Sequence, residues 1–251
     1  MELFDLTDKV ALVSGCSQGL GYACVLTLAR NGCDIFGVSI GDDSHLKEEV
    51  EACGRKYHSL TASLTTPGVI DQVVKECLAA YGHIDILLNF AGIVRKNRTL
   101  HVDEECFDAV MDINAKACFF LSQAVIKKMI EQGHGGKIIN ASGVIAQRSS
   151  NDFLPFTAAK GALEAMTKAL ANEFASEDIQ VNAISFGYMT TGTRLQLDES
   201  GDVDHEILRQ IPAGRWGCYK DVDGLLLLLA SKASNYMTGC VIPVDGGFSI
   251  H

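Results

Sequence analysis

Short apolar runs rich in valine and isoleucine alternate along the chain with longer segments of helical period. This alternation is typical of a parallel sheet that is covered by helices on both faces. The pattern therefore predicts an α/β protein with a doubly wound, seven-stranded parallel sheet. Strands are predicted near residues 9–14, 34–40, 56–60, 84–89, 137–141, 180–184 and 240–244, and helices are predicted to begin near Gly19, Ser44, Gly68, Asp103, Pro155 and Lys220, with a short one near Asp204.

No repeat, low-complexity tract or Pro/Ser-rich linker interrupts this alternation. Residues 1–251 are therefore predicted to form a single domain. The one irregular stretch, residues 190–201, follows a strand at the carboxyl edge of the sheet, where ligands of α/β proteins bind. A substrate lid near residues 190–211 is one interpretation of this stretch, and an inert surface loop is the other.

The charge balance bears on partners and location. The chain has 21 basic and 31 acidic residues, a net charge of −10. Such a field repels phosphate backbones and anionic membranes, so neither nucleic acid nor a membrane is predicted as a partner. The longest apolar stretch, residues 225–230, is too short to span a bilayer, and no secretory leader is evident. A cytoplasmic location is the resulting expectation.

Cysteine and histidine are both dispersed. The nine cysteines include no Cys-x-x-Cys pair, and no two of the seven histidines have a His-x-x-x-His spacing. A disulfide framework and a metal site are therefore not predicted.

The first predicted strand ends in the run Ser14-Gly15-Cys16-Ser17-Gln18-Gly19-Leu20-Gly21, and an apolar helix follows. Glycine there lets backbone amides approach a pyrophosphate at the positive end of a helix. The spacing is Gly-x-x-x-Gly-x-Gly rather than Gly-x-Gly-x-x-Gly, and a tight turn is the structural alternative. Its position after the first strand favours a dinucleotide site in a Rossmann-type fold.

The chain resembles the short-chain dehydrogenase/reductase family over essentially its whole length. Asn89-Phe90-Ala91-Gly92 is similar to the family's Asn-Asn-Ala-Gly, Asn114 stands where its active-site Asn lies, and Val244-Asp245-Gly246-Gly247 closes the chain. Within the family, residues 32–35, 187–189 and 211–217 look like dehydrogenases of 2-keto-3-deoxygluconate and 2-deoxygluconate. The resemblance implies a homotetrameric oxidoreductase that acts on a sugar acid or a similar small hydroxy or keto compound.

The resemblance also shows which catalytic groups are absent. The family places a Tyr four residues before a Lys, so that both lie on one face of a helix, and here this pair is Phe156 and Lys160. A phenyl ring cannot carry the proton that the family's Tyr transfers. The family's Ser lies thirteen residues before its Tyr, at Gly143 in this chain. Ser142 is one residue early and should point to the opposite face of the strand unless a bulge intervenes.

The resemblance further implies a set of cofactor contacts. Ser39 ends the second strand, where NAD-preferring members usually have Asp, and no Arg follows to hold a 2′-phosphate. NAD is therefore expected over NADP. The implied cofactor-binding residues are Gly15, Ser17, Gly19, Leu20, Gly21, Ser39, Ser63, Leu64, Asn89, Ala91, Gly92, Lys160, Gly187 and Thr191.

Three further residues are candidates for the substrate pocket. Asp152 and Tyr188 are candidate replacements for the missing proton donor, although Asp152 has the alternative role of a helix cap. Arg148 could bind a substrate carboxylate, as could Arg95 or Lys96, and a surface cation is the alternative for each of them.

Two functional hypotheses follow. In the first, the protein is an NAD(P)-dependent oxidoreductase in which Asn114 and Lys160 position a water relay that replaces the tyrosine. Loss of a general acid/base costs a factor of ~10²–10⁴ in rate. In the second, it is a catalytically degenerate relative that binds a dinucleotide or metabolite as a sensor or as an inert oligomer partner. The second hypothesis is favoured by four positions where polar or rigid family residues are replaced: Phe90, Gly143, Phe156 and Phe186. The first is favoured by the intact glycine loop and by Asn114, Lys160 and Thr191.

Overall fold

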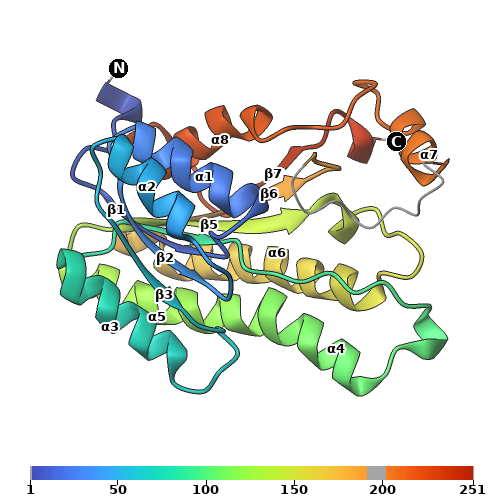
Figure 1. Ribbon diagram of the computed structural model, residues 1–251, viewed down its shortest axis with the longest axis horizontal. Helices are drawn as coiled ribbons and strands as arrows, with labels where there is room; N and C mark the ends of the chain where they lie inside the picture. The colour runs from blue at the N-terminus through green and yellow to red at the C-terminus, as the bar shows by residue number, and fades with distance from the viewer. Residues whose placement is uncertain (1, 191–201, 251) are drawn as a thin grey trace.

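The computed structural model describes residues 2–190 and 202–250. Its seven strands form one parallel sheet in the order β3-β2-β1-β4-β5-β6-β7, so the predicted doubly wound sheet is confirmed (Figure 1). The strands are β1 Val10–Ser14, β2 Asp34–Ser39, β3 Tyr57–Thr61, β4 Ile86–Asn89, β5 Gly136–Gly143, β6 Ile179–Phe186 and β7 Val241–Val244.

Helices cover both faces of this sheet. Helices α1, α2 and α8 lie on one face, and α3, α5 and α6 lie on the other (Figure 1). The helix bounds are α1 Gly19–Arg30, α2 Ser44–Ala52, α3 Val69–Tyr81, α4 Glu104–Met111, α5 Ala117–Gln132, α6 Leu154–Phe174, α7 Asp202–Arg209 and α8 Lys220–Ala230. Short helical turns are η1 Glu2–Phe4, η2 Thr99–His101, η3 Asp112–Lys116, η4 Val144–Ala146, η5 Ala175–Glu177, η6 Lys232–Ser234 and η7 Phe248–Ile250.

The helices begin close to the predicted residues because capping and amphipathic signals agree. Asp103 caps α4, and its carboxylate accepts a hydrogen bond from the Cys106 backbone nitrogen at 2.7 Å. Gly68 precedes α3 in the left-handed conformation, with φ of 80°. Val69, Val73 and Cys77 then repeat at helical spacing and are buried against the sheet.

Strands β5 and β6 extend beyond their predicted ends. In the structure β5 and β6 stay paired through Ser142↔Ser185 and Gly143↔Phe186 without a bulge. The predicted strands end too early, at residues 141 and 184, because serine, glycine and phenylalanine interrupt the Val/Ile-rich run after them. The extra residues carry the ends of both strands into the region where the site lies.

Helices α4 and α5 form one continuous helical segment with a π-helical turn, η3, between them. The turn contains Asn114, which is fully buried. In the described part of the chain, Glu104–Gln132 is the one helix long and apolar enough to cross a membrane, and 50% of its most apolar window is buried inside the protein. The continuous helix packs between α3 and α6 as a core element.

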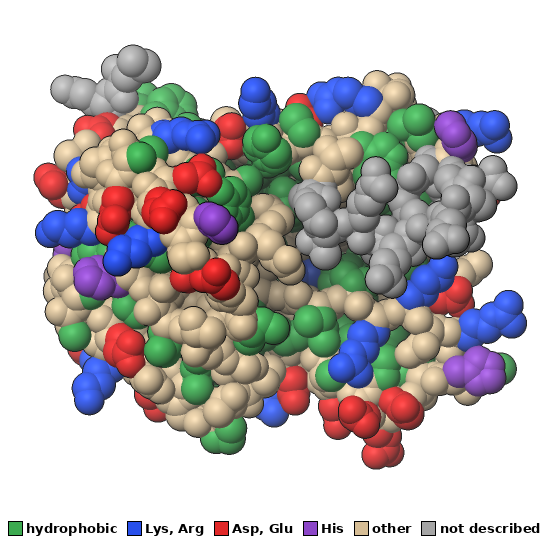
Figure 2. All heavy atoms as spheres, viewed as in Figure 1, with side chains coloured by type: hydrophobic (Ala, Val, Ile, Leu, Met, Phe, Trp, Pro, Cys, Tyr) green, Lys and Arg blue, Asp and Glu red, His purple; other side chains and the backbone are tan. Residues whose placement is uncertain are grey.

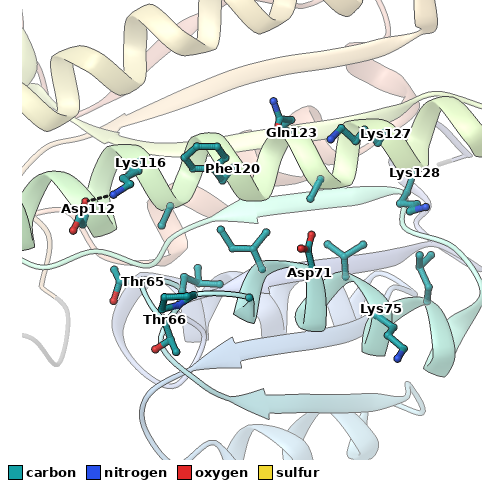
Figure 3. Close-up of a pocket in the computed structure, with 18 residues that line it drawn as sticks. Thr65, Thr66, Asp71, Lys75, Asp112, Lys116, Phe120, Gln123, Lys127 and Lys128 are labelled. Atoms are coloured by element: carbon teal, nitrogen blue, oxygen red, sulfur yellow. Dashed lines mark hydrogen bonds and ion pairs between the residues drawn. The ribbon is translucent and has the colours of Figure 1, made fainter.

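One face of the molecule carries acidic side chains over α1 and α2, with lysines, arginines and histidines among them (Figure 2). On the other helical layer, a cavity of about 780 Å³ runs between α3 and α5, and its lining includes the lysines Lys75, Lys116, Lys127 and Lys128 (Figure 3). This cavity lies among helix side chains rather than between the diverging ends of β1 and β4.

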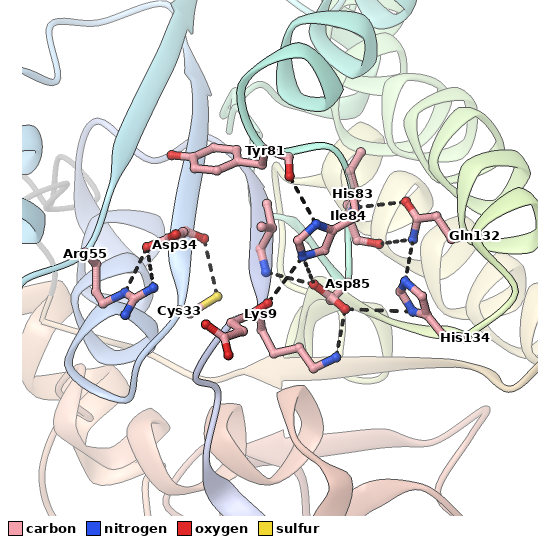
Figure 4. A network of polar contacts seen from close by, with 12 residues as sticks. Lys9, Cys33, Asp34, Arg55, Tyr81, His83, Ile84, Asp85, Gln132 and His134 are labelled. Atoms are coloured by element: carbon pink, nitrogen blue, oxygen red, sulfur yellow. Dashed lines mark hydrogen bonds and ion pairs between the residues drawn. The ribbon is translucent and has the colours of Figure 1, made fainter.

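At the amino edge of the sheet, the carboxylate of Asp85 joins several elements (Figure 4). It accepts hydrogen bonds from the Val10 backbone nitrogen and the Lys9 ammonium, both at 2.9 Å, and the His83 imidazole lies 3.1 Å away. The Asp85 side chain is 7% exposed, so these partners replace most of its solvent. The network fixes the start of β4 against the start of β1.

We predict that Asp85→Asn lowers the free energy of unfolding by about 1–3 kcal/mol, because a buried group loses charged partners. Urea denaturation measures the change. Asp108→Asn, on the exposed face of α4, is the matched control and should change stability little. Equal stability of the two variants would contradict a structural role for the network.

Candidate functional site

In open parallel sheets the ligand crevice lies where the strand order reverses, which in this sheet falls between the carboxyl ends of β1 and β4. Gly15 has φ of 73°, and a Cβ atom there would lie 2.6 Å from the Ala91 Cα atom. A Cβ atom on Gly21 would overlap the carbonyl oxygen of Gly15. Only glycine fits both positions, so the loop before α1 exposes backbone rather than side chains. This cradle at a helix N-terminus suits a pyrophosphate.

Ser14 holds the two walls of the crevice together, a role that the sequence analysis missed. Its hydroxyl accepts hydrogen bonds from the backbone nitrogens of Phe90 and Ala91 at 3.1 and 3.3 Å, and it donates to the Leu88 carbonyl at 3.2 Å. A hydroxyl residue at the end of an otherwise apolar buried strand was the available signal.

Asn89 lies beneath the crevice in a buried polar network. Its amide donates to the Ser122 hydroxyl at 2.9 Å and to the Asn140 side-chain oxygen at 2.8 Å. Asn140 in turn donates to the Thr167 hydroxyl at 2.9 Å. These bonds connect β4 and β5 with α5 and α6, so the Asn89 side chain supports the crevice floor.

Lys160 and Asn114 meet beside Gly92. The Lys160 ammonium donates to the Ala141 carbonyl at 2.6 Å, and the residue is 7% exposed. The Asn114 amide donates to the carbonyls of Ile93 and Val110, both at 2.9 Å, while its oxygen is buried without a hydrogen-bond partner among the described residues. A Cβ atom on Gly92 would lie 2.5 Å from that oxygen and 4.0 Å from the ammonium. The structure thus brings together Asn114 and Lys160, two of the residues predicted for the nicotinamide side.

Burial lowers the pKa of Lys160 below its ordinary value of 10.5. The titratable neighbour among the described residues is Cys118, and burial raises the pKa of that thiol to about 11. The ammonium also lies 5.3 Å from the centre of the Phe156 ring, a weak cation–π contact that partly replaces lost water. No carboxylate in the described chain pairs with Lys160.

Gly143 and Phe156, which stand where the family has Ser and Tyr, lie on the strand and the helix expected for them. Phe156 is in the first turn of α6, one helical turn before Lys160, and packs beside Ile93 and Met111. Gly143 ends β5 in extended conformation, and a Cβ atom there would meet its nearest neighbours at 3.6 and 3.8 Å. The backbone therefore does not require glycine at this position.

Ser142 points away from Gly143, as predicted for its neighbour on a regular strand. Its hydroxyl donates to the Glu164 carboxylate on α6 at 2.8 Å, and the residue is 4% exposed. It is therefore engaged elsewhere and does not replace the missing hydroxyl.

The other two substituted positions contact each other. The rings of Phe90 and Phe186 meet edge to face, with centroids 5.8 Å apart. They come from the ends of β4 and β6 and pack against the core on the α1 side of the sheet. The two changes together put one apolar surface beside the crevice.

The candidate substrate residues do not form one cluster. The Arg148 guanidinium donates to the Phe248 carbonyl at 2.9 Å and lies over the Phe248 ring, so it serves the protein's own C-terminal turn. The Tyr188 ring packs edge to face on Phe248 and Trp216. The role of Arg148 as a ligand of a substrate carboxylate remains a prediction, and so does the role of Tyr188 as the proton donor.

The capping role considered for Asp152 is wrong. Helix α6 begins at Leu154 after Phe153, and no side chain caps it. Asp152 instead has a left-handed backbone, with φ of 70°, and lines a groove of about 580 Å³ between the loops that follow β4 and β5. The polar residues of this groove are Arg98, Thr99, Ser149, Ser150, Asn151, Asp152 and Thr157.

The remaining predicted cofactor residues lie along the carboxyl edge, except for Thr191, which lies outside the described residues together with residues 191–201 of the predicted lid. The Ser63 hydroxyl bonds that of Thr65 at 2.8 Å, and Leu64 is buried in the α3 layer. Gly187 lies against the backbone of Asp245, where a Cβ atom would approach to 2.6 Å. Ser17 lies in the glycine-rich loop between β1 and α1, Gly19 and Leu20 begin α1, and Ser39 ends β2.

Comparisons with known proteins extend over the whole chain. The family model described as enoyl-(acyl carrier protein) reductase matches residues 15–249. A 2-dehydro-3-deoxy-D-gluconate 5-dehydrogenase of Dickeya dadantii (strain 3937) is 43% identical over 248 residues, covering 99% of this chain and 98% of the relative. The gluconate 5-dehydrogenase of Gluconobacter oxydans (strain 621H) is 34% identical, with 99% and 98% covered.

Solved structures agree with the sequence relatives. A short-chain type dehydrogenase/reductase from Mycobacterium marinum has a TM-score of 0.93 and 32% identity, covering 100% of this chain and 99% of that one. A dehydrogenase structure from Agrobacterium tumefaciens with bound NADP has a TM-score of 0.91 and 32% identity, covering 100% of both chains.

Two glycine variants test the geometry of the crevice. Gly15→Ala should displace the loop backbone from its binding position and weaken NADH binding by roughly tenfold or more, because a loss of about 1.4 kcal/mol in binding free energy raises the dissociation constant tenfold. It should also lower the melting temperature because of its positive φ. Gly143→Ala should leave both unchanged, because the added methyl group has room. Fluorescence titration measures the NADH affinity, and thermal denaturation measures the melting temperature. Equal affinities and equal melting temperatures of the two variants would contradict the need for glycine at residue 15.

Proposed function

Because the chain belongs to the short-chain dehydrogenase/reductase family of oxidoreductases, we propose that it interconverts a hydroxyl and a keto group on a sugar acid, with NAD(H) as its cofactor. The observation that carries the proposal is the arrangement of Lys160, Asn114 and Gly92 at the crevice. The buried Lys160 ammonium has no carboxylate partner in the described chain, and the Asn114 side-chain oxygen accepts no hydrogen bond there. Burying two such groups costs stability, so a chain that served only as a scaffold would have no reason to keep them.

Two observations support a sugar acid as the substrate. The two sequence relatives given above carry names of dehydrogenases of gluconate and of a keto-deoxy gluconate. The groove between the loops after β4 and β5 is lined by hydroxyl and amide side chains, with the Arg98 guanidinium and the Asp152 carboxylate among them. Such a lining suits a ligand with several hydroxyls and one carboxylate.

The described residues fit a nicotinamide dinucleotide. Gly15, Gly19 and Gly21 would hold its pyrophosphate, Ser39 its adenosine ribose, and Lys160 its nicotinamide ribose. When bound, the cofactor supplies or accepts the hydride. NAD is proposed over NADP, because no cation lies among residues 39–44 at the end of β2.

Proton transfer has to proceed without the family's tyrosine. We propose that Lys160 carries the proton and exchanges it with the substrate oxygen through a water molecule held beside Asn114. When the substrate is reduced, the ammonium gives up a proton as the hydride reaches carbon; when it is oxidised, neutral Lys160 accepts one. Its lowered pKa brings both forms closer to working pH.

A homotetramer without nucleic acid or membrane partners is proposed on two observations. The outer face of α6 exposes the small residues Ala158, Ala165 and Ala169, which would allow two helices to approach closely. The net charge of −10 disfavours anionic partners.

Restoring the hydroxyl pair tests the proposal. The double variant Gly143→Ser/Phe156→Tyr should raise kcat on 2-keto-3-deoxygluconate or its reduced form by ~10²–10⁴, the usual effect of a general acid/base. NADH affinity, followed by fluorescence, should stay the same. Gly161→Ser/Phe174→Tyr makes the same chemical changes elsewhere on α6 and should have no effect.

The wild type decides between the two functional hypotheses in the same assay. Slow turnover that the double variant accelerates supports the altered mechanism. NADH binding without any wild-type turnover overturns it in favour of a binding protein, and absence of binding by NADH and NADPH overturns the cofactor assignment.

The pH dependence tests the role of Lys160. Because burial lowers the pKa of Lys160, the neutral form gains population below pH 10.5. The kcat for oxidation should therefore rise with pH through that pKa, and the kcat for reduction should fall through it. Lys160→Arg, which keeps the charge but does not titrate, should flatten both profiles, while Lys168→Arg on the exposed side of α6 should preserve them. A wild-type slope that persists in Lys160→Arg would exclude Lys160 as the proton carrier.

A further inference from the structure

The end of β2 has no acidic residue, but the loop that follows it brings a carboxylate back against the neighbouring strand, β3. In a Rossmann-type crevice the residue at this strand end meets the adenosine ribose, and a carboxylate there disfavours a 2′-phosphate. This chain has Ser39, whose hydroxyl donates to the Gly41 carbonyl at 3.0 Å. The loop then continues through Asp42 and Asp43 into α2.

The Asp43 carboxylate is held from β3. It accepts hydrogen bonds from the Tyr57 hydroxyl at 2.7 Å and from the Ser59 hydroxyl at 3.2 Å. Both donors stand on β3, the strand paired with β2, so the position of the half-exposed carboxylate is fixed against that strand. Burial raises the pKa of Tyr57 far above its ordinary value, and its hydroxyl therefore remains a donor.

A notch in β2 lets this tyrosine reach the phosphate loop. The notch is Gly37, where a Cβ atom would lie 2.5 Å from the Tyr57 hydroxyl and 2.7 Å from the Cys16 sulfur. The Tyr57 hydroxyl lies 3.7 Å from that sulfur, and Cys16 follows Gly15 directly. In the loop after β2, a Cβ atom on Gly41 would lie 3.0 Å from the Ser17 hydroxyl. Asp43 is thus connected through one side chain to the loop that holds the pyrophosphate.

The charges around this point are mostly of one sign. Asp42 is next in the chain and accepts hydrogen bonds from the Ser44 backbone nitrogen and hydroxyl at 3.0 and 3.1 Å. The basic residues nearest in sequence are His45 and Lys47, and Lys47 pairs with Glu51 at 3.9 Å. Arg55 pairs with Asp34 at the opposite end of β2. Figure 2 shows acidic side chains over α1 and α2 with basic ones interspersed.

We infer that Asp43, positioned by Tyr57 through the notch at Gly37, supplies the negative charge that Ser39 lacks and selects NAD(H) by repelling the 2′-phosphate of NADP(H). The inference rests on the proposed function only in taking the crevice to bind a nicotinamide dinucleotide. It explains how a chain with a neutral strand end can differ in cofactor choice from a relative of similar fold that holds NADP.

Binding of NADH and NADPH to the wild type and to Asp43→Asn tests the inference by fluorescence titration. Asparagine keeps the size and the acceptor for Tyr57 but removes the charge. The ratio of the dissociation constants for NADPH and NADH should fall about fivefold, the order expected for one charge facing a phosphate across several ångströms of solvated protein. Glu48→Gln, an exposed carboxylate on α2, is the matched control and should leave the ratio unchanged.

Ionic strength gives a second readout, and its first part is measured on the wild type alone. Screening by salt weakens repulsion, so the wild-type ratio should decrease between about 0.05 and 0.5 M salt. The decrease should be smaller in Asp43→Asn. Tyr57→Phe keeps the ring but releases the carboxylate, so it should lower the ratio at low salt although the charge remains.

The outcomes separate this inference from the proposed function. NADH binding with a ratio that is unchanged by Asp43→Asn and independent of salt overturns the role of Asp43 and leaves the cofactor assignment intact. Absence of binding by both dinucleotides overturns the cofactor assignment and the inference with it.

Discussion

The crevice depends on two backbone segments that approach more closely than side chains allow. Gly15, after β1, and the turn of Phe90 and Ala91, after β4, meet where a Cβ atom would have no room, and the Ser14 hydroxyl bonds both backbone nitrogens of that turn. A hydroxyl that accepts two such bonds fixes the separation of the two strand ends without filling the space above them. The positions of α1, of Gly92 and, through Gly92, of Asn114 all follow from this contact.

The site combines the backbone frame of its family with altered chemistry at its centre. Lys160 is buried among a carbonyl, a thiol and a phenyl ring, where a tyrosine oxygen would have been a far better partner for a cation. Desolvation without a counter-ion disfavours the charged form, and the same effect that costs stability makes the amine a better carrier of a proton near neutrality. Phe90 and Phe186 contact each other, so the apolar surface is a packed unit rather than two separate losses.

Periodicity predicted the strands well because both faces of a parallel sheet are buried, and the apolar runs are therefore unbroken. It failed at the ends of β5 and β6, where pairing continues through small and aromatic residues. Spacing within one helix placed Phe156 and Lys160 correctly relative to each other, since helical geometry is local. The role of Arg148 at the C-terminal turn and the path from Tyr57 to Asp43 could not be predicted, because each depends on segments that meet only in the folded chain.

The π-helical turn at η3 has a consequence for how the chain can vary. It holds one residue more than a regular α-helical turn would, and the helix packs against α6 before the turn and against α3 after it. Because the turn takes up that residue locally, deleting it would restore a regular α-helix without rotating the residues that follow, and Leu121 and Val125 would stay buried. The Asn114 amide lies in the turn itself and would lose its bond to the Ile93 carbonyl. The helix can therefore lose this residue and keep its packing, but it would then lose the amide contact beside the crevice.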